Sequence, residues 1–169
     1  MLIKDNIILI GMPASGKSTI GVILAKLMGM RFIDSDILIQ DKTGRRLAGI
    51  IEEEGVDGFI SIEEDVNASI EASGTVIATG GSVVYGQRAM EHFKEIGKIV
   101  YLKVSEKTIK GRLDDIKGRG VVIRRGQTFE DLYRERTALY EQYADLIIDE
   151  DGHSAEEVLS MLKESLDIE

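Results

Sequence analysis

The sequence contains no cysteine and only two histidines, and these absences remove whole classes of chemistry. Without thiols the chain has no disulfide framework, no thiolate nucleophile and no cysteine-based zinc site. His92 and His153 are too far apart in the sequence to indicate a metal cluster. Proline occurs once, at Pro13, and no low-complexity linker divides the 169 residues. We therefore expect one domain over residues 1–169, since about 100–200 residues per domain is usual.

Long hydrophobic runs and an excess of positive charge are also missing. The longest apolar run near the start, Ile7–Ile10, is too short for the core of a signal peptide or for a membrane-spanning helix. Lysine and arginine number 21 against 30 aspartate and glutamate residues, a net charge of −9. Such a surface does not favour binding to nucleic acid or to anionic membrane. We expect a cytoplasmic monomer that binds neither nucleic acid nor membrane.

Short apolar segments alternate with helical patterns along the chain. Five such segments predict strands: Ile7–Ile10, Phe32–Ile33, Val76–Ala78, Ile99–Val104 and Leu146–Ile148. Ser18–Met28 repeats apolar residues at helical spacing and predicts a helix. Capping-box patterns predict further helices that begin at Ser61, Thr128 and Ser154, and the first of these should end near Gly74. This alternation indicates a three-layer α/β/α fold with a parallel sheet, which binds ligands beyond the carboxyl ends of its strands.

Residues Gly11–Ser18 fit the phosphate-binding pattern G-x-x-x-x-G-K-[ST], between a predicted strand and an amphipathic helix. Glycines let consecutive backbone N–H groups turn toward phosphate oxygens, and the helix N-terminus adds partial positive charge. Lys17 should reach the β- and γ-phosphates, and the Ser18 hydroxyl should bind Mg²⁺. A glycine-rich turn with an incidental lysine is disfavoured, because the pattern and its flanks agree. The predicted nucleotide-binding residues here are Gly11, Ala14, Ser15, Gly16, Lys17, Ser18 and Thr19.

Two acids, Asp34 and Asp36, follow the second predicted strand. In an extended chain, residues two apart share a face, so both carboxylates should point into one crevice above the sheet. One would hold Mg²⁺, directly or through water, and the other would accept a proton or hydrogen bond from an attacking hydroxyl. The alternative is a solvated, polar strand end, and the spacing alone does not decide between the two.

A third feature is an arginine on an apolar helical face. Leu132, Arg136, Leu139 and Tyr143 recur at helical spacing, so Arg136 is expected among apolar side chains. A guanidinium there is costly unless it meets an anion. That anion is either a substrate or a helix carboxylate in a structural ion pair.

A glycine-flanked basic stretch, residues 118–126, contains Arg119, Arg124 and Arg125 and has no clear period. In an acidic chain, such a loop is well placed to close over a triphosphate and exclude water. The alternative is an ordinary solvated loop, which we favour for Arg124 and Arg125.

In this order and at this spacing, the motifs resemble those of the shikimate kinase family, within the nucleoside-monophosphate-kinase-like P-loop kinases. The matching pieces are Gly11–Gly21, Phe32–Asp36, Thr43-Gly44, Ala78–Gly81, Arg112 with Arg119, and Arg136–Glu141 with Ala144-Asp145. The resemblance covers nearly the whole chain. It implies a P-loop kinase fold with a five-stranded parallel sheet, a mobile lid at about residues 114–127 and an acceptor-binding region at about residues 34–64. The implied reaction is phosphoryl transfer from ATP, with Mg²⁺, to a hydroxyl of a small carboxylated alcohol, with shikimate favoured.

The resemblance also implies roles for single residues. Asp34 corresponds to the Mg²⁺-associated carboxylate, and Asp36 to the residue that grips and deprotonates the acceptor hydroxyl. Arg119 resembles the lid arginine and, with Lys17 and Asp36, completes the implied catalytic set. Arg112 resembles the arginine beside the adenine. The residues implied to bind the acceptor are Asp36, Gly80, Gly81 and Arg136.

The chain departs from the family pattern mainly on the acceptor side. Where the family has Gly-Glu-x-x-Phe-Arg-x-x-Glu, residues 55–63 carry Ile60 in place of the arginine that would bind the substrate carboxylate. Val56 replaces the acid of the same pattern, Ser82 replaces the third glycine of a Gly-Gly-Gly turn, and no proline follows Arg119. Truncating one partner of a buried charge pair costs about 2–5 kcal/mol of binding free energy. The replacement of arginine by Ile60 is therefore the departure that matters most for binding a carboxylated substrate.

Several functions therefore stay open from the sequence alone. The chain is a shikimate kinase that uses Arg136 with another cation, Arg45 or Arg46, or it phosphorylates a different small alcohol. A nucleotide-binding module without acceptor chemistry is suggested by Ile60 and Ser82. A P-loop NTPase that drives a partner is disfavoured, because the apolar run that starts at Val76 leads through Thr79 to Gly80 rather than to an acid.

Overall fold

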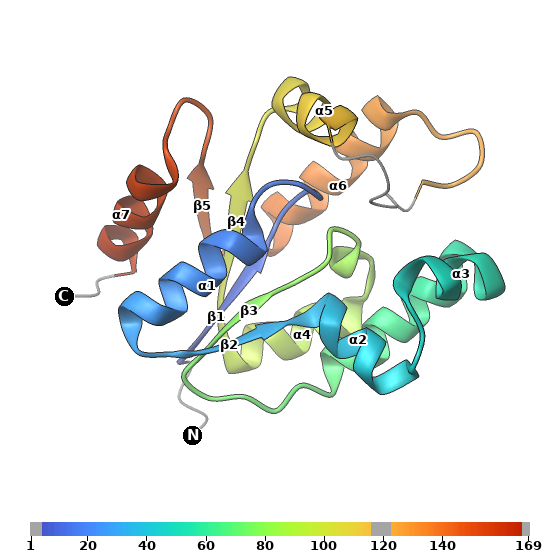
Figure 1. The fold of residues 1–169 in the computed structure, drawn as a ribbon, viewed down its shortest axis with the longest axis horizontal. Coiled ribbons are helices and arrows are strands. Elements are labelled where there is room, and N and C mark those ends of the chain that lie inside the picture. The colour runs from blue at the N-terminus through green and yellow to red at the C-terminus, as the bar shows by residue number, and fades with distance from the viewer. Residues whose placement is uncertain (1–4, 116–122, 167–169) are drawn as a thin grey trace.

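Five parallel strands form one sheet, in the order β2-β3-β1-β4-β5 (Figure 1). In the computed structural model, which describes residues 5–115 and 123–166, the strands are β1 Asn6–Ile10, β2 Arg31–Asp34, β3 Thr75–Ala78, β4 Gly97–Lys103 and β5 Leu146–Asp149. Ile8 of β1 lies between Ile77 of β3 and Ile99 of β4, and all three are fully buried. Helices cover both faces, which is why these strands read as unbroken apolar runs. The predicted five-stranded parallel sheet is confirmed.

Helices occupy both faces of the sheet. Their bounds are α1 Lys17–Met28, α2 Ser35–Thr43, α3 Leu47–Ala68, the 3₁₀ turn η1 Val83–Tyr85, α4 Gln87–Ile96, α5 Glu106–Asp115, α6 Phe129–Tyr143 and α7 Ala155–Ser165. Helices α1 and α7 pack on one face, and α4 and α6 on the other, each pair forming an apolar cluster with the strands (Figure 1). This three-layer arrangement matches the predicted fold class. No helix in the described part of the chain is long and apolar enough to cross a membrane.

Helices α2 and α3 stand apart from these layers, beyond the end of β2 (Figure 1). They enclose a small apolar cluster of their own, formed by Ile39, Ile50, Phe59 and Val66. The segment also packs against α4 and η1 through α3, and it forms a wall beside the carboxyl end of the sheet.

The helix start predicted at Ser61 is wrong. Ser61 lies inside α3, which bends at Gly55 (φ 74°, ψ 179°) and continues past the serine. The helix also ends earlier than expected, at a cap formed by Ser69 rather than near Gly74. Apolar residues on both sides of Ser61 pack in the cluster between α2 and α3, and this packing keeps the chain helical through Ser61. The capping-box pattern at Ser61 is therefore overridden by tertiary packing. The capping boxes predicted at Thr128 and Ser154 are both confirmed.

A buried amide ties the amino ends of three strands together. The Asn6 side chain donates to the carbonyl oxygens of Ala72 (2.8 Å) and Ile96 (2.9 Å). Its own oxygen accepts a hydrogen bond from the backbone N–H of Thr75 at 3.0 Å. Asn6 is 2 % exposed, so water cannot replace these partners.

We expect Asn6→Ala to lower the free energy of unfolding by about 2–4 kcal/mol, because it leaves three backbone groups without a partner. Urea denaturation measures this change. Ser73→Ala is the matched control, since it removes only an exposed hydrogen bond to Asp5, and it should cost less than about 0.5 kcal/mol. Equal effects of the two substitutions would contradict the structural role of Asn6.

Candidate active site

A cleft of about 550 Å³ opens at the carboxyl ends of β1, β2 and β3. Its first wall is the Gly11–Ser18 loop with the start of α1, and its second is the α2–α3 segment. The third wall is the turn after β3, together with Arg136 of α6. The cleft therefore lies at the edge of the sheet where the sequence places its motifs.

The Gly11–Ser18 loop has the geometry of an anion site. Gly11 (φ 152°) passes so close to β4 that a Cβ atom would lie 2.7 Å from the carbonyl oxygen of Leu102. Gly16 (φ 92°) forms the cap of α1, and no side chain caps the first N–H groups of that helix. Ala14 (φ 63°) is the one non-glycine residue of the described chain with a positive φ. The positive end of the α1 dipole, whose first N–H groups no side chain caps, thus lies at the cleft.

Lys17 lies in the centre of this loop. Its ammonium group donates to the carbonyl oxygens of Gly11 (2.8 Å) and Met12 (2.7 Å) and to the hydroxyl of Ser15 (3.3 Å). The side chain is buried and lines the cleft. These contacts hold a positive charge beside the N-terminus of α1, an arrangement that suits phosphate oxygens.

Asp34 is bonded on both carboxylate oxygens. Its Oδ2 accepts a hydrogen bond from the Ser18 hydroxyl at 2.9 Å. Its Oδ1 accepts from the backbone N–H groups of Asp36 (3.0 Å) and Ile37 (3.3 Å), so Asp34 is the cap of α2. A hydroxyl and a carboxylate oxygen side by side are hard donors of the kind that Mg²⁺ prefers.

Asp34 and Asp36 do share the cleft, but not for the reason that the sequence suggested. The chain is not extended through this pair, because α2 begins at Ser35. Asp34 ends β2, whereas Asp36 projects from the first turn of the helix. The strand-to-helix junction, rather than a strand face, brings both carboxylates into one cleft.

Asp36 meets a second carboxylate at Gly80. A Cβ atom on Gly80 would lie 2.8 Å from Asp36 Oδ1 and 2.8 Å from Glu63 Oε2, so only glycine leaves room for both. Glu63 comes from α3 and is 1 % exposed, and its Oε1 accepts a hydrogen bond from the Ser82 hydroxyl at 2.6 Å. Burial, with a smaller contribution from the negative charge of Asp36, raises the pKa of Glu63 to about 7. The Ser82 hydrogen bond and the charge of Arg136 oppose the rise.

Arg136 occupies the neighbouring position beside Gly81. Its Nη1 lies 3.0 Å from where a Gly81 Cβ would stand, and its guanidinium lies 5.5 Å from the centre of the Tyr85 ring. The side chain is 1 % exposed and lies between buried Leu132 and Tyr140 of the same helix. The prediction of an arginine on the apolar face of α6 is therefore confirmed, and its guanidinium lines the cleft.

Two groups flank the far side of the phosphate loop. Arg112 of α5 donates to the carbonyl oxygen of Ala14 at 3.0 Å. Glu150, which follows β5, reaches to 3.9 Å from where a Gly16 Cβ would stand. Burial raises the pKa of Glu150 to about 7, while Arg112 and Lys17 oppose the rise. Glu150 was not predicted, because a lone acid after a strand belongs to no motif.

Most predicted site residues come together. Those that line the cleft are Ala14, Gly16, Lys17, Ser18, Thr19, Asp34, Asp36, Gly80, Gly81 and Arg136. Gly11 and Ser15 lie in the loop and contact Lys17, and Arg112 contacts the same loop from outside. Arg119 and residues 116–122 of the predicted lid lie outside the described residues.

The departures from the family pattern are placed as follows. Ile60 does not line the cleft; it packs against the apolar cluster between α2 and α3. Ser82 lines the cleft and binds Glu63. Arg124 is exposed, as expected, and pairs at 3.0 Å with Asp57 of α3, which is exposed as well. Arg46 lines the cleft and was only one of two candidates in the sequence.

A phosphate loop, two carboxylates beside it and a buried arginine in one cleft define a P-loop phosphotransferase with a small acceptor. The shikimate kinase family model matches residues 13–167. Curated shikimate kinases from Aliivibrio fischeri (35% identical, 97% of this chain and 97% of the relative) and Mannheimia succiniciproducens (36%, 97% and 96%) are similar along their length. A solved shikimate kinase from Acinetobacter baumannii in complex with shikimate is 31% identical, with a TM-score of 0.85, over 98% of this chain and 95% of that one. The chain belongs to the shikimate kinase family.

The buried Glu63 carboxyl makes a prediction about pH. Its ordinary pKa of 4.5 is raised to about 7 in the folded protein, so between these values the folded chain keeps a proton that the unfolded chain has lost. The contribution of the protonated Glu63 carboxyl to the free energy of unfolding is complete below pH 4.5, and it is lost as the pH rises through about 7. We expect Glu63→Gln to remove a fall in unfolding free energy of about 3 kcal/mol over that window, measured by urea denaturation at several pH values.

Ser82→Ala gives the opposite result in the same measurement. The Ser82 hydroxyl favours the charged form of Glu63, so its loss should extend the fall in stability to higher pH. Glu150 is present in every variant, and its contribution cancels in the differences. Parallel stability curves for wild type, Glu63→Gln and Ser82→Ala would contradict the assignment of a raised pKa to Glu63.

Proposed function

We propose that this protein transfers the γ-phosphoryl group of ATP to a hydroxyl of shikimate, giving shikimate 3-phosphate and ADP. The observation that carries the proposal is the position of Asp36, whose carboxylate shares one cleft with the phosphate loop. The acceptor oxygen forms a bond to the γ-phosphorus, the bond from that phosphorus to the β,γ-bridging oxygen of ATP breaks, and the hydroxyl proton leaves toward Asp36.

The loop wall supplies the nucleotide half of the site. Its backbone amides and the Lys17 ammonium group bind the β- and γ-phosphates and neutralise charge that develops during transfer. Arg112, hydrogen-bonded to Ala14, lies at the outer side of the loop, where the base and ribose of ATP would extend. Arg119 remains a predicted contributor from the lid.

Ser18 and Asp34 would hold Mg²⁺. Their oxygen atoms are adjacent, and two protein donors suit this ion, which usually takes its remaining ligands from phosphates and water. Among the described residues, no cluster of three or more acids, histidines or cysteines offers a complete metal cage. When bound, the ion neutralises phosphate charge.

The acceptor half lies between Gly80, Gly81 and the α2–α3 wall. Asp36 orients the acceptor hydroxyl and takes its proton, while Arg136 supplies a buried positive charge for a carboxylated substrate. The loss of arginine at Ile60 does not leave this half without cations, because Arg46 and Arg136 both line the cleft. That supports a carboxylated acceptor over an uncharged alcohol.

The role of Asp36 is tested by Asp36→Asn, which keeps the shape of the side chain and removes its basicity. We expect kcat to fall by about 10²- to 10⁴-fold while the KM for ATP changes little, measured as shikimate-dependent ADP release. Asp41→Asn, an exposed change on the same helix, is the matched control. Shikimate phosphorylation at the wild-type rate by Asp36→Asn would overturn the assignment.

Gly80→Ala tests the close approach of Asp36 to the backbone. The added Cβ would collide with the carboxylates of Asp36 and Glu63, and Gly80 is not in the left-handed region, so the collision alone decides the outcome. A displacement of Asp36 by about 1 Å should lower kcat by about 10²-fold.

Gly49→Ala is the control for Gly80→Ala, because its Cβ meets open space in α3. It should leave turnover unchanged and raise the free energy of unfolding by about 0.4–1 kcal/mol. Full activity in Gly80→Ala would show that the packing of Asp36 against Gly80 does not matter for the reaction.

A further inference from the structure

Three basic residues line the cleft, and they differ in what surrounds them: Lys17, Arg46 and Arg136. Lys17 bonds to carbonyl groups of its own loop, and Arg136 is buried against Gly81 and Tyr85. Arg46 is exposed, and no carboxylate among the described residues lies within ion-pair distance of it. Arg46 is therefore the lining cation that an anion entering from solvent reaches without displacing a neighbouring acid.

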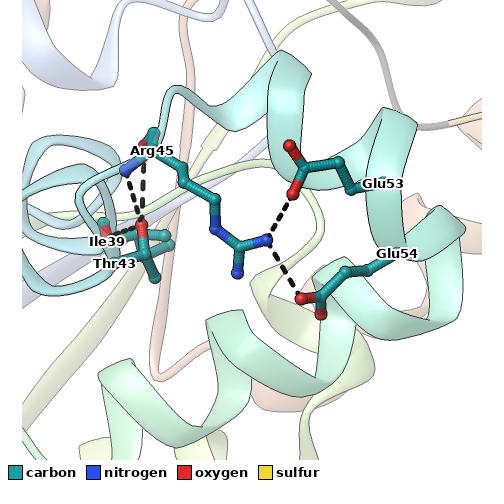
Figure 2. Close-up of polar contacts among 5 residues, drawn as sticks. All are labelled: Ile39, Thr43, Arg45, Glu53 and Glu54. Atoms are coloured by element: carbon teal, nitrogen blue, oxygen red, sulfur yellow. Dashed lines mark hydrogen bonds and ion pairs between the residues drawn. The ribbon is translucent and has the colours of Figure 1, made fainter.

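The adjacent arginine is occupied elsewhere. Arg45 contacts Glu53 at 2.9 Å and Glu54 at 3.0 Å, both on the first part of α3 (Figure 2). Arg45 does not line the cleft. Of the two arginines, only Arg46 is placed to contact a bound acceptor.

The turn between α2 and α3 separates the two side chains. Gly44 (φ 67°) ends α2, and the Thr43 hydroxyl donates to Ile39 and accepts from the backbone N–H of Arg45 (Figure 2). Arg46 then adopts an extended conformation (φ −71°, ψ 149°) as the cap of α3. Arg45 pairs with the two acids of α3, and Arg46, one residue further on, lines the cleft.

The surroundings of Arg46 suit an anion. Leu47, Ala48 and Ile51 of the same helix form an apolar wall of the cleft beside it. The first turn of α3 contains no acidic residue, and no side chain caps its N–H groups. An anion there gains the partial positive charge of the helix end in addition to the guanidinium. Ile60, further along α3, packs away from the cleft.

The Gly80 end of the cleft suits the opposite kind of group. Asp36 and Glu63 both approach that glycine, so an acceptor carboxylate placed there would face two acids. A hydroxyl, which can donate to Asp36, is favoured at the same place. The acceptor therefore has its reacting hydroxyl near Gly80 and its carboxylate near the cations.

We propose that Arg46 determines acceptor specificity in this chain, by binding the carboxylate of the substrate together with Arg136. The proposal rests on the proposed function and names the residue that fills the role left open by Ile60. Arg46 acts on binding and takes no part in the phosphoryl transfer itself.

Arg46→Gln tests the proposal, with Arg45→Gln as the matched control on the neighbouring residue. We expect Arg46→Gln to raise the KM for shikimate by about 10- to 100-fold, the loss of one charge-assisted contact. The kcat at saturating shikimate and the KM for ATP should stay near wild type. Arg46→Lys should be intermediate, and Arg45→Gln should resemble wild type.

An acceptor that lacks the carboxylate charge provides a second test of Arg46. In this analogue of shikimate, a CH₂OH group replaces the carboxylate. Wild type should bind it with a raised KM, and Arg46→Gln should raise that KM no further, because the contact is already absent. A rise of the same size with both acceptors would mean that Arg46 acts on the structure of the cleft, and would overturn the proposal.

The remaining outcomes separate this inference from the function on which it rests. If wild type releases no ADP in response to shikimate, the proposed function fails, and the role of Arg46 fails with it. If wild type phosphorylates shikimate but Arg46→Gln and Arg45→Gln have equal KM values, only the assignment of Arg46 is overturned.

Discussion

The approach of two carboxylates to one glycine is the constraint on which the site depends. Asp36 and Glu63 come from different helices and meet at Gly80, where any side chain would collide with both. Glu63 is buried there, and burial together with the charge of Asp36 raises its pKa, while Asp36 lines the same cleft as the phosphate loop. The backbone turn after β3 thus fixes where the two carboxylates meet.

Charge inside the cleft is balanced rather than absent. Three basic residues and three acidic residues line it: Lys17, Arg46 and Arg136, and Asp34, Asp36 and Glu63. Buried charges are tolerated only when opposite charges and hydrogen bonds compensate for lost water. The hydroxyl of Ser82, where the family pattern has glycine, supplies one such hydrogen bond to Glu63. The acceptor half has therefore been rearranged, and its polar character is kept.

The phosphate loop and the acceptor wall are built on different parts of the molecule. The phosphate loop is built on the central strand β1, which is buried between β3 and β4 and covered on both faces. The acceptor wall is the α2–α3 segment, with a small apolar cluster of its own. Changes such as Ile60 fall in that cluster and leave the sheet and the loop intact. The phosphate loop and the acceptor wall therefore rest on different apolar clusters.

The sequence by itself determined the features that depend on fixed local spacing. These are the phosphate loop, the alternation of strands and helices, the capping boxes at Thr128 and Ser154, and the burial of Arg136 on α6. Only the tertiary structure decided that Ser61 is interior to α3, that Glu63 reaches Gly80, and which of two adjacent arginines lines the cleft. The physical reason is that these outcomes depend on contacts between segments far apart in the chain, and no local pattern records which segment will be the neighbour.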